Sequence, residues 1–441
     1  MKRKRSDVEL KHLLIIVYKI AQVGMIIFPQ AEQRFNPYPF YMNMRNLHPI
    51  EYDDKSSAWG VFRYKDIQDI LNDYENFSSD LQKWQYPEHR EIQRNLITSD
   101  PPLHKQLYNQ ISSSFNSNII SELEYRIKEI AKEILNHVIE NGHMDLITDL
   151  AYPLTIKVIA ELLGIPPEDH NIYNMWVNRL VREVGGTVIN PISKATIQIQ
   201  QEMNSYLQKV IQKHKEEERP HVGLISNMLR DWVYHNNDEE GKVEGVRSKN
   251  NERSRMSEDR LLSFCSQLLI AGYMTTTNLI GNIFLSLLEN PQEFKQLQEN
   301  LSLIPSVIEE TLRYRSPIQS IFRFAVNDVK LGGKMISSGQ KVIVWLGSAN
   351  RDETVFNCPD RFDITRDTRA HLAFGSGIHS CIGAPLARLE AHIVLEVMLQ
   401  QLQNVTLIDY DQKSLEPVDS LVLHGVKHLP LKFKPGRTVK D

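Results

Sequence analysis

Residues 374–385 read Phe-Gly-Ser-Gly-Ile-His-Ser-Cys-Ile-Gly-Ala-Pro, and no other stretch of the chain is as informative. Gly375 and Gly377 let the backbone turn tightly and approach a flat partner closely, because glycine has no Cβ. Cys381 stands just before a predicted helix, whose N-terminus favours a thiolate over a thiol. Gly383 leaves room for a bulky group against the backbone. A lone thiolate in a glycine-rich turn suits axial ligation of haem iron.

The cysteine count agrees with a single acting thiol. The 441 residues include three cysteines, at positions 265, 358 and 381, without a Cys-x-x-Cys pair. So small and odd a number excludes a disulfide framework and a four-cysteine zinc site, and it is typical of a reducing cytoplasm. Lys and Arg number 51 against 55 Asp and Glu, and this net charge of −4 argues against a nucleic-acid binder. We expect Cys265 in the packed core and Cys358 in a loop, without a role.

The motif Phe-Gly-x-Gly-x-His-x-Cys-x-Gly at 374–383 resembles the haem-thiolate motif of the cytochrome P450 family. Two further motifs stand in the family's order. Glu-Thr-Leu-Arg at 310–313 resembles its Glu-x-x-Arg helix, and Pro-Asp-Arg-Phe at 359–362 resembles the element that follows. The stretches 349–352 and 385–390 look like those of the soluble bacterial branch.

This resemblance covers about residues 35–433 and implies a single P450 domain over residues 35–435. Its fold class is mainly α with small β-sheets (α+β), built around haem b. By the same resemblance, Glu310, Arg313 and Arg361 would form a buried charge network on the side of the haem that bears the cysteine.

The hydrophobic pattern of the chain also predicts mostly helix with a minor β component. The longest apolar helix pattern runs from Glu258 to Glu289, and the almost entirely polar residues 236–256 before it predict an exposed loop. Residues 350–375 are irregular, and residues 436–441 form a tail. The strand-like stretches are short and lie near residues 318–326, 341–346, 405–409 and 430–433.

Residues 1–34 are predicted to be an N-terminal extension. The chain opens with Lys-Arg-Lys-Arg after the first Met, and the apolar stretch 13–28 that follows is shorter than the roughly 20 residues of a membrane-spanning helix. No small-x-small cleavage site follows it. Three readings stay open: a gene-model extension before Met25 or a disordered tail, an amphipathic helix on a membrane surface, and a true membrane anchor. Contact of residues 1–28 with a membrane is possible but is not the favoured interpretation.

The resemblance implies a set of haem contacts. His104, Arg323 and His379 would bind the haem carboxylates. The family usually has an Arg four positions after the residue matching His104, where this chain has Tyr108. A phenol donates one hydrogen bond but carries no charge, so one carboxylate contact is weakened or replaced. The iron ligand and the turn around it would be Cys381, Phe374, Gly375, Gly377 and Gly383.

The long apolar helix pattern carries an awkward centre, Ala-Gly-Tyr-Met-Thr-Thr-Thr at 271–277. Glycine and β-branched threonines are poor helix formers, and such a local inconsistency points to a functional site. By the resemblance, a gap in helix hydrogen bonding at Gly272 would make room for dioxygen, and the Thr275 hydroxyl would donate to it or hold a water. The family normally has an acid just before that Thr, but this chain has Met274, whose thioether cannot shuttle protons.

Three explanations of Met274 remain open. Water and Thr275 deliver protons alone; another acid or a group on the substrate takes part; or the chain uses peroxide, needs less proton delivery, or is poorly active. The family's substrate-facing segments correspond to residues 81–97, 176–187, 270–275, 318–321 and 422–424. We expect an apolar pocket formed by Ile270, Ala271, Ile318, Ile321 and Leu423.

The function implied by the resemblance is a haem-thiolate monooxygenase that inserts one oxygen atom from O2 into a C–H bond. The expected substrate is an apolar small molecule: a fatty acid, terpenoid, steroid or polyketide-like compound. No flavin or dinucleotide module is recognisable, so we expect electrons from a separate ferredoxin or flavodoxin with its reductase, docking near Cys381. A cytoplasmic monomer that binds no nucleic acid is expected. A peroxide-driven peroxygenase and a non-catalytic haem-binding protein remain alternatives.

Overall fold

The computed structural model describes residues 27–80, 83, 95–112, 117–172, 175–176, 179, 194–216, 258–408 and 415–436. Four predicted features fall wholly or mostly outside this part: the stretch before Ile27, the segments 81–97 and 176–187, the polar loop 236–256, and the tail after Gly436.

Helices make up most of the described chain, as the sequence predicts, and α11 has the predicted limits of the longest apolar pattern. The α-helices are α2 (Tyr38–Leu47), α3 (Tyr64–Asn72), α5 (Leu103–Ser112), α6 (Ser117–Asn136), α7 (Tyr152–Leu162), α9 (Lys194–Glu216), α11 (Glu258–Glu289), α12 (Pro291–Glu299), α13 (Ile304–Tyr314), α14 (Leu346–Ala349) and α15 (Ala384–Gln401). A π-helical segment, η5 (Leu146–Ala151), precedes α7. The short 3-10 helices are η1 (Ala31–Gln33), η4 (Ile139–Asn141), η6 (Pro167–Asp169), η7 (Leu301–Leu303) and η8 (Gly377–His379).

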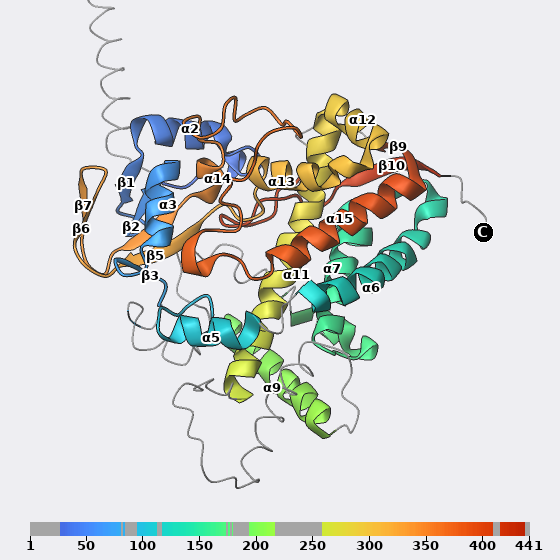
Figure 1. The fold of residues 1–441 in the computed structure, drawn as a ribbon, viewed down its shortest axis with the longest axis horizontal. Coiled ribbons are helices and arrows are strands. Elements are labelled where there is room, and N and C mark those ends of the chain that lie inside the picture. Colours follow the sequence, from blue (N-terminus) through green and yellow to red (C-terminus); the bar gives the residue numbers. More distant parts are fainter. Residues whose placement is uncertain are drawn as a thin grey trace, which may run out of the picture.

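The strands of the described residues form small sheets to the side of the helices (Figure 1). The strands are β1 (Ile50–Asp53), β2 (Ala58–Val61), β3 (Phe77–Ser78), β4 (His143–Asp145), β5 (Ile321–Ala325), β6 (Val329–Leu331), β7 (Lys334–Ile336), β8 (Lys341–Val344), β9 (Leu402–Leu407) and β10 (Pro430–Pro435). One sheet has the order β1-β2-β8-β5-β3, with β2 parallel to β8 and the other pairs antiparallel. A second sheet has the order β4-β10-β9, and β6 pairs with β7. The predicted strand-like stretches thus become β5, β8, β9 and β10.

Helix α11 runs through the middle of the helical part, with α7, α9, α13 and α15 packed against it (Figure 1). Its second half is buried on all sides, and Ile280, Ile283 and Phe284 are 0% exposed. Among the described residues it is the one helix long and apolar enough to cross a membrane, but 72% of its most apolar window is buried inside the fold. The apolar sequence of α11 is therefore explained by its place in the core.

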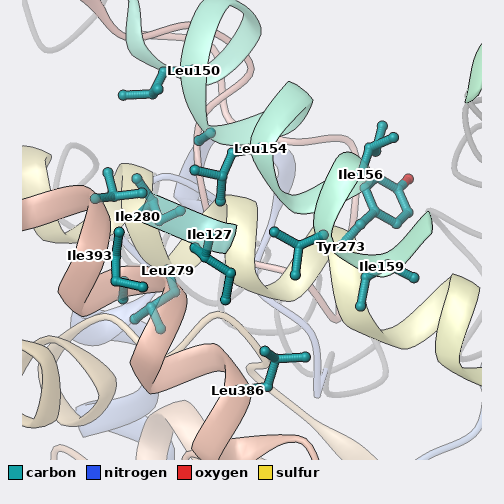
Figure 2. Close-up of a cluster of buried hydrophobic side chains, with 14 of the residues drawn as sticks. Ile127, Leu150, Leu154, Ile156, Ile159, Tyr273, Leu279, Ile280, Leu386 and Ile393 are labelled. Carbon is teal, nitrogen blue, oxygen red and sulfur yellow. The ribbon is translucent and has the colours of Figure 1, made fainter. Parts of the chain in front are cut away.

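A continuous apolar cluster joins α6, α7, α11 and α15. Figure 2 shows Leu154 of α7 and Ile127 of α6 beside Leu279 and Ile280 of α11, with Ile393 of α15 next to them. Burying such side chains stabilises a fold by about 1.5–3 kcal/mol each relative to leaving them exposed. This cluster holds α11 and α15 in fixed positions, and these helices carry residues of the predicted site.

The predicted charge network on α13 forms, but with a different membership. Glu310 and Arg313 are both 0% exposed and are joined by two hydrogen bonds of 2.7 and 2.8 Å. The side chain of Arg361 is 69% exposed, and only its backbone carbonyl takes part, accepting from Arg313 at 3.2 Å. The cation that completes the network is Arg366, whose Nε lies 3.4 Å from Glu310 Oε1.

Position 361 was therefore predicted wrongly as a charged member of this network. The irregular chain after α14 turns its Arg361 side chain to solvent and brings Arg366 back under α13. Asp363 also donates its backbone N–H to Glu310 Oε1, at 2.9 Å. The pair thus holds the loop through backbone groups as well as through charge.

We predict that Glu310→Gln lowers the free energy of unfolding by about 3–5 kcal/mol, because it leaves a buried guanidinium without its closest counter-ion. The matched change Arg361→Gln keeps the backbone carbonyl and removes an exposed charge, so its expected effect is below about 0.5 kcal/mol. Urea denaturation of both variants measures the difference. Equal losses in the two variants would contradict this assignment.

Candidate functional site

The loop that carries Cys381 is tightly closed. Gly375 and Gly377 have φ values of +74° and +71°, the left-handed region that glycine adopts without strain. The backbone N–H of Cys381 donates to the carbonyl of Phe374 at 2.9 Å. A Cβ at Gly377 would lie 2.6 Å from the carbonyl oxygen of Leu71, so the loop is pressed against the end of α3. Both motif glycines are therefore required by backbone geometry.

The Cys381 thiol is subject to opposing influences. Burial of its sulfur raises the pKa of Cys381, while the backbone N–H groups of Gly383 and Ala384 and the charge of Arg388 lower it, and the net direction is upward. The helix N-terminus thus acts as the sequence predicts, but burial outweighs it. If Cys381 binds a metal ion, that ion deprotonates its thiol.

The three predicted carboxylate-binding residues come from three elements and meet near this loop. The rings of His104 on α5 and His379 on η8 have centroids 4.4 Å apart, in an edge-to-face arrangement. Arg323 on β5 is 6% exposed, and its NH1 donates to the carbonyl of Phe322 at 2.8 Å. No carboxylate of the described residues makes an ion pair with Arg323.

The electrostatics of this cluster fit an anionic partner. Burial lowers the pKa of Arg323 to about 10, although Asp100 opposes the effect. Burial, together with Arg323 and His104, lowers the pKa of His379 to about 3. The Nε2 atom of His379 is buried without a hydrogen-bond partner among the described residues. Buried donors of this kind are satisfied by a group that brings carboxylates, as haem does.

Tyr108 and Asp100 complete the surroundings of the cluster. Tyr108 is 42% exposed, and its ring lies parallel to that of His104, with centroids 6.2 Å apart. Asp100 accepts from the Ser78 hydroxyl and from the backbone N–H of Ser79 at 2.9 Å. Asp100 was not among the predicted site residues, although its charge acts on Arg323 and His379. A folded structure was needed to bring the two together.

Helix α11 presents Ile270 and Ala271 as exposed residues between the buried residues Leu269 and Tyr273, and Ile270 is 38% exposed. The Thr275 hydroxyl donates to the Ala271 carbonyl, one turn earlier, at 2.8 Å. The helix is assigned without a break from Glu258 to Glu289, so the gap predicted at Gly272 is not present in this structure. The accessible face of the helix thus contains the predicted threonine.

Gly272 faces a side chain of α7, whereas the sequence predicted that it makes room for dioxygen. A Cβ at this position would lie 2.6 Å from Cδ1 of Ile159 on α7, so the glycine lets two core helices approach closely. Figure 2 shows Ile159 beside Tyr273 on this part of α11. The absence of a side chain here is explained by packing between α7 and α11.

Met274 is partly buried and packs against the main core cluster. The acidic residues of α11 lie only at its ends, at Glu258, Asp259 and Glu289. No acid of this helix therefore lies within three turns of Thr275.

The predicted pocket residues are brought together in part. Ile318 and Leu423 form an isolated antiparallel bridge, and Gln319 donates its N–H to the Val422 carbonyl at 2.7 Å. Ile321 is half-buried at the start of β5. Two distant segments of the predicted pocket thus lie side by side.

The chain is similar to known proteins both in sequence and in fold. A family model described as Cytochrome P450 matches residues 174–429. Cytochrome P450 109 of Bacillus spizizenii is 35% identical over 411 residues, 91% of this chain and 93% of the relative. Erythromycin C-12 hydroxylase of Saccharopolyspora erythraea is 33% identical over 392 residues, 88% of this chain and 92% of the relative. The crystal structure of CYP109E1 from Bacillus megaterium in complex with testosterone has a TM-score of 0.76 and 33% identity, covering 90% of this chain and 99% of that one.

The geometry of the cysteine loop gives a prediction with a matched control. Gly377→Ala should cost more stability than Gly333→Ala, because both glycines have positive φ but a Cβ at Gly333 meets nothing within 4 Å. We expect about 1–2 kcal/mol for the control, from backbone strain alone, and a larger loss for Gly377→Ala. Denaturant unfolding measures both. A smaller loss at Gly377 than at Gly333 would contradict the close contact with Leu71.

Proposed function

Because the chain belongs to the cytochrome P450 family, it is an oxidoreductase of the haem b monooxygenase type, and we propose that Cys381 is the residue that binds its haem iron. The observation that carries this assignment is the closed loop at positive φ that presents one thiol beside a cluster of buried donors. When bound, haem supplies the oxygen chemistry, and a thiolate ligand donates the electron density that favours O–O cleavage.

The chain's own residues would hold the group from two directions. His104, His379 and Arg323 would bind its carboxylates, because they meet at one place, His379 Nε2 is buried without a hydrogen-bond partner among the described residues, and Arg323 makes no ion pair with a described carboxylate. Gly375 and Gly377 would let the cysteine loop approach the group closely, and the Phe374 carbonyl closes that loop by accepting from Cys381 N–H. Tyr108 adds no charge, so the carboxylates depend mainly on Arg323.

On the opposite side, Thr275 would hold a proton-bearing water at its hydroxyl. That hydroxyl donates to the Ala271 carbonyl at 2.8 Å, which leaves its lone pairs to accept from water. Since Met274 cannot relay protons and the acids of α11 lie at its ends, water and Thr275 carry this task.

The substrate would be an apolar small molecule bound beside Ile270 and Ala271 of α11 and beside the bridge between Ile318 and Leu423. Relatives of this chain include a structure with testosterone and an enzyme that hydroxylates erythromycin. Steroids and polyketide-like compounds are therefore the first substrates to test, before fatty acids and terpenoids. Electrons would come from a separate ferredoxin or flavodoxin with its reductase, and we place this protein in the cytoplasm as a monomer.

The ligand assignment predicts a spectroscopic result. In the wild type, reduction under carbon monoxide should give the red-shifted band of a thiolate-ligated haem. Cys381→Ser should abolish this band, whereas Cys358→Ser, at an exposed loop thiol, should leave it unchanged. A wild-type protein that binds haem without the band would refute Cys381 as ligand.

The proton-delivery assignment predicts a change in coupling. Met274→Glu should raise the product formed per O2 consumed, because it places an acid directly before Thr275. Met274→Gln has the same size without a titratable group and serves as control. An unchanged ratio of product to consumed O2 in a folded Met274→Glu variant would contradict the proposal that Met274 limits proton delivery.

The peroxide-driven alternative rests on the same residue, Met274. Wild-type turnover is therefore compared with hydrogen peroxide and with a reductase pair. Turnover that requires the reductase pair would exclude this alternative, and oxygenated product from either source would exclude the non-catalytic one.

A further inference from the structure

A second charged cluster lies directly beside the Cys381 loop and is not part of the Glu310 network. Glu309 of α13 accepts two hydrogen bonds from Arg388 of α15, from Nε at 2.5 Å and from NH2 at 2.9 Å. This two-pronged geometry is the strongest that an Arg–carboxylate pair adopts. Residues 309 and 310 are adjacent, so their side chains leave α13 in different directions and enter different networks.

His371 fixes the other side of the Glu309 carboxylate. Its Nε2 lies 2.9 Å from Glu309 Oε2, and its Nδ1 accepts from the backbone N–H of Ala373 at 3.2 Å. Because Nδ1 accepts, Nε2 carries the proton and donates to Glu309. The His371 side chain is 6% exposed, so this contact is well sheltered from water.

Glu309 therefore remains an anion over the working range of pH. Burial alone would raise the pKa of Glu309, but the hydrogen bonds from Arg388 and His371 lower it to about 2. Its charge opposes that of Arg388 at short range.

Arg388 in turn reaches the loop that carries the thiol. Its guanidinium carbon lies 4.6 Å from the centre of the Phe374 ring. The carbonyl of Phe374 accepts the backbone N–H of Cys381 at 2.9 Å. The charge of Arg388 also lowers the pKa of the Cys381 thiol. A cation at this position lies between the anion Glu309 and the sulfur-bearing loop.

We propose that Arg388 and Glu309 set the electron affinity of the haem iron through Cys381, with Arg388 favouring the reduced form and Glu309 limiting that effect. The physical basis is charge: a cation near the ligand stabilises the added electron, and an anion destabilises it. His371 is a positioning residue, because it holds the Glu309 carboxylate against Arg388. The inference rests on the proposed role of Cys381 as ligand.

The test is the one-electron reduction potential of the haem-loaded protein. Arg388→Gln should shift the equilibrium toward the oxidised form by about tenfold, a potential lower by about 59 mV. Glu309→Gln should shift it toward the reduced form by a similar factor, because Arg388 then acts without its counter-ion. Arg388→Lys keeps the charge and should lie closer to the wild type than Arg388→Gln does.

Arg126→Gln is the matched control. Arg126 forms the same two-pronged pair with Glu161, at 2.8 and 2.7 Å. The side chains of that pair are 47% and 26% exposed, against 40% and 27% for Arg388 and Glu309. Arg126 lies on α6 and pairs with α7, and it makes no hydrogen bond, ion pair or ring contact with the Cys381 loop among the described residues. Its removal should therefore leave the potential unchanged.

A charge effect predicts potential shifts of opposite sign in Arg388→Gln and Glu309→Gln, whereas a loss of loop structure predicts shifts of the same sign. Shifts of the same sign in Arg388→Gln and Glu309→Gln, or shifts no larger than that of Arg126→Gln, would overturn the proposal. Slower reduction by a protein donor at unchanged potential would overturn it as well, because Arg388 would then serve in docking.

The carbon monoxide band of each variant is recorded beside its potential. A wild type without the thiolate-type band refutes the proposed ligand. A wild type with the band but without opposite shifts refutes this inference alone. If Arg388→Gln does not fold, Glu309→Gln still tests the inference, because a shift of that variant toward the oxidised form would overturn it.

Discussion

The buried pair between Glu310 and Arg313 is the contact on which the cysteine side of the molecule depends. The chain between α14 and the cysteine loop has little regular secondary structure, so its backbone polar groups need partners from elsewhere. Arg313 donates to the carbonyls of Asn350 and Pro359, each at 2.9 Å, and also to that of Arg361. One guanidinium thus fixes three points of an irregular segment, and that segment leads directly into the cysteine loop. Removal of either charge would leave the other buried, which is why the pair is retained despite its desolvation cost.

The opposite side of the site rests on the packing of α11. Gly272 brings α7 to within contact of the helix, and the apolar cluster around Leu279 and Ile280 joins α11 to α15. The helix that carries Thr275 and the helix that begins after Cys381 therefore belong to one packed core (Figure 2). Their separation is set by side-chain volume, because protein interiors are close-packed and deform little.

Adjacent acids on α13 serve two purposes. Glu310 is fully buried and supports the loop, whereas Glu309 is partly exposed and pairs with Arg388 near the thiol. Two adjacent residues of α13 thus take part in separate contacts: Glu310 supports the segment before the cysteine loop, and Glu309 pairs with the charge of Arg388 beside that loop.

The sequence by itself determined the family, the helical fold class, the limits of α11 and the identity of the loop around Cys381, because these are written in local spacing and residue type. The positive φ values of Gly375 and Gly377 also follow from their place in the motif. Other features were decided only by the tertiary structure, because they depend on contacts between distant residues: the replacement of Arg361 by Arg366, the contact of Gly272 with Ile159, and the cluster of Glu309, His371 and Arg388. The raised pKa of the Cys381 thiol is another such feature, since it depends on burial, which is a property of the folded chain and cannot be deduced from a motif.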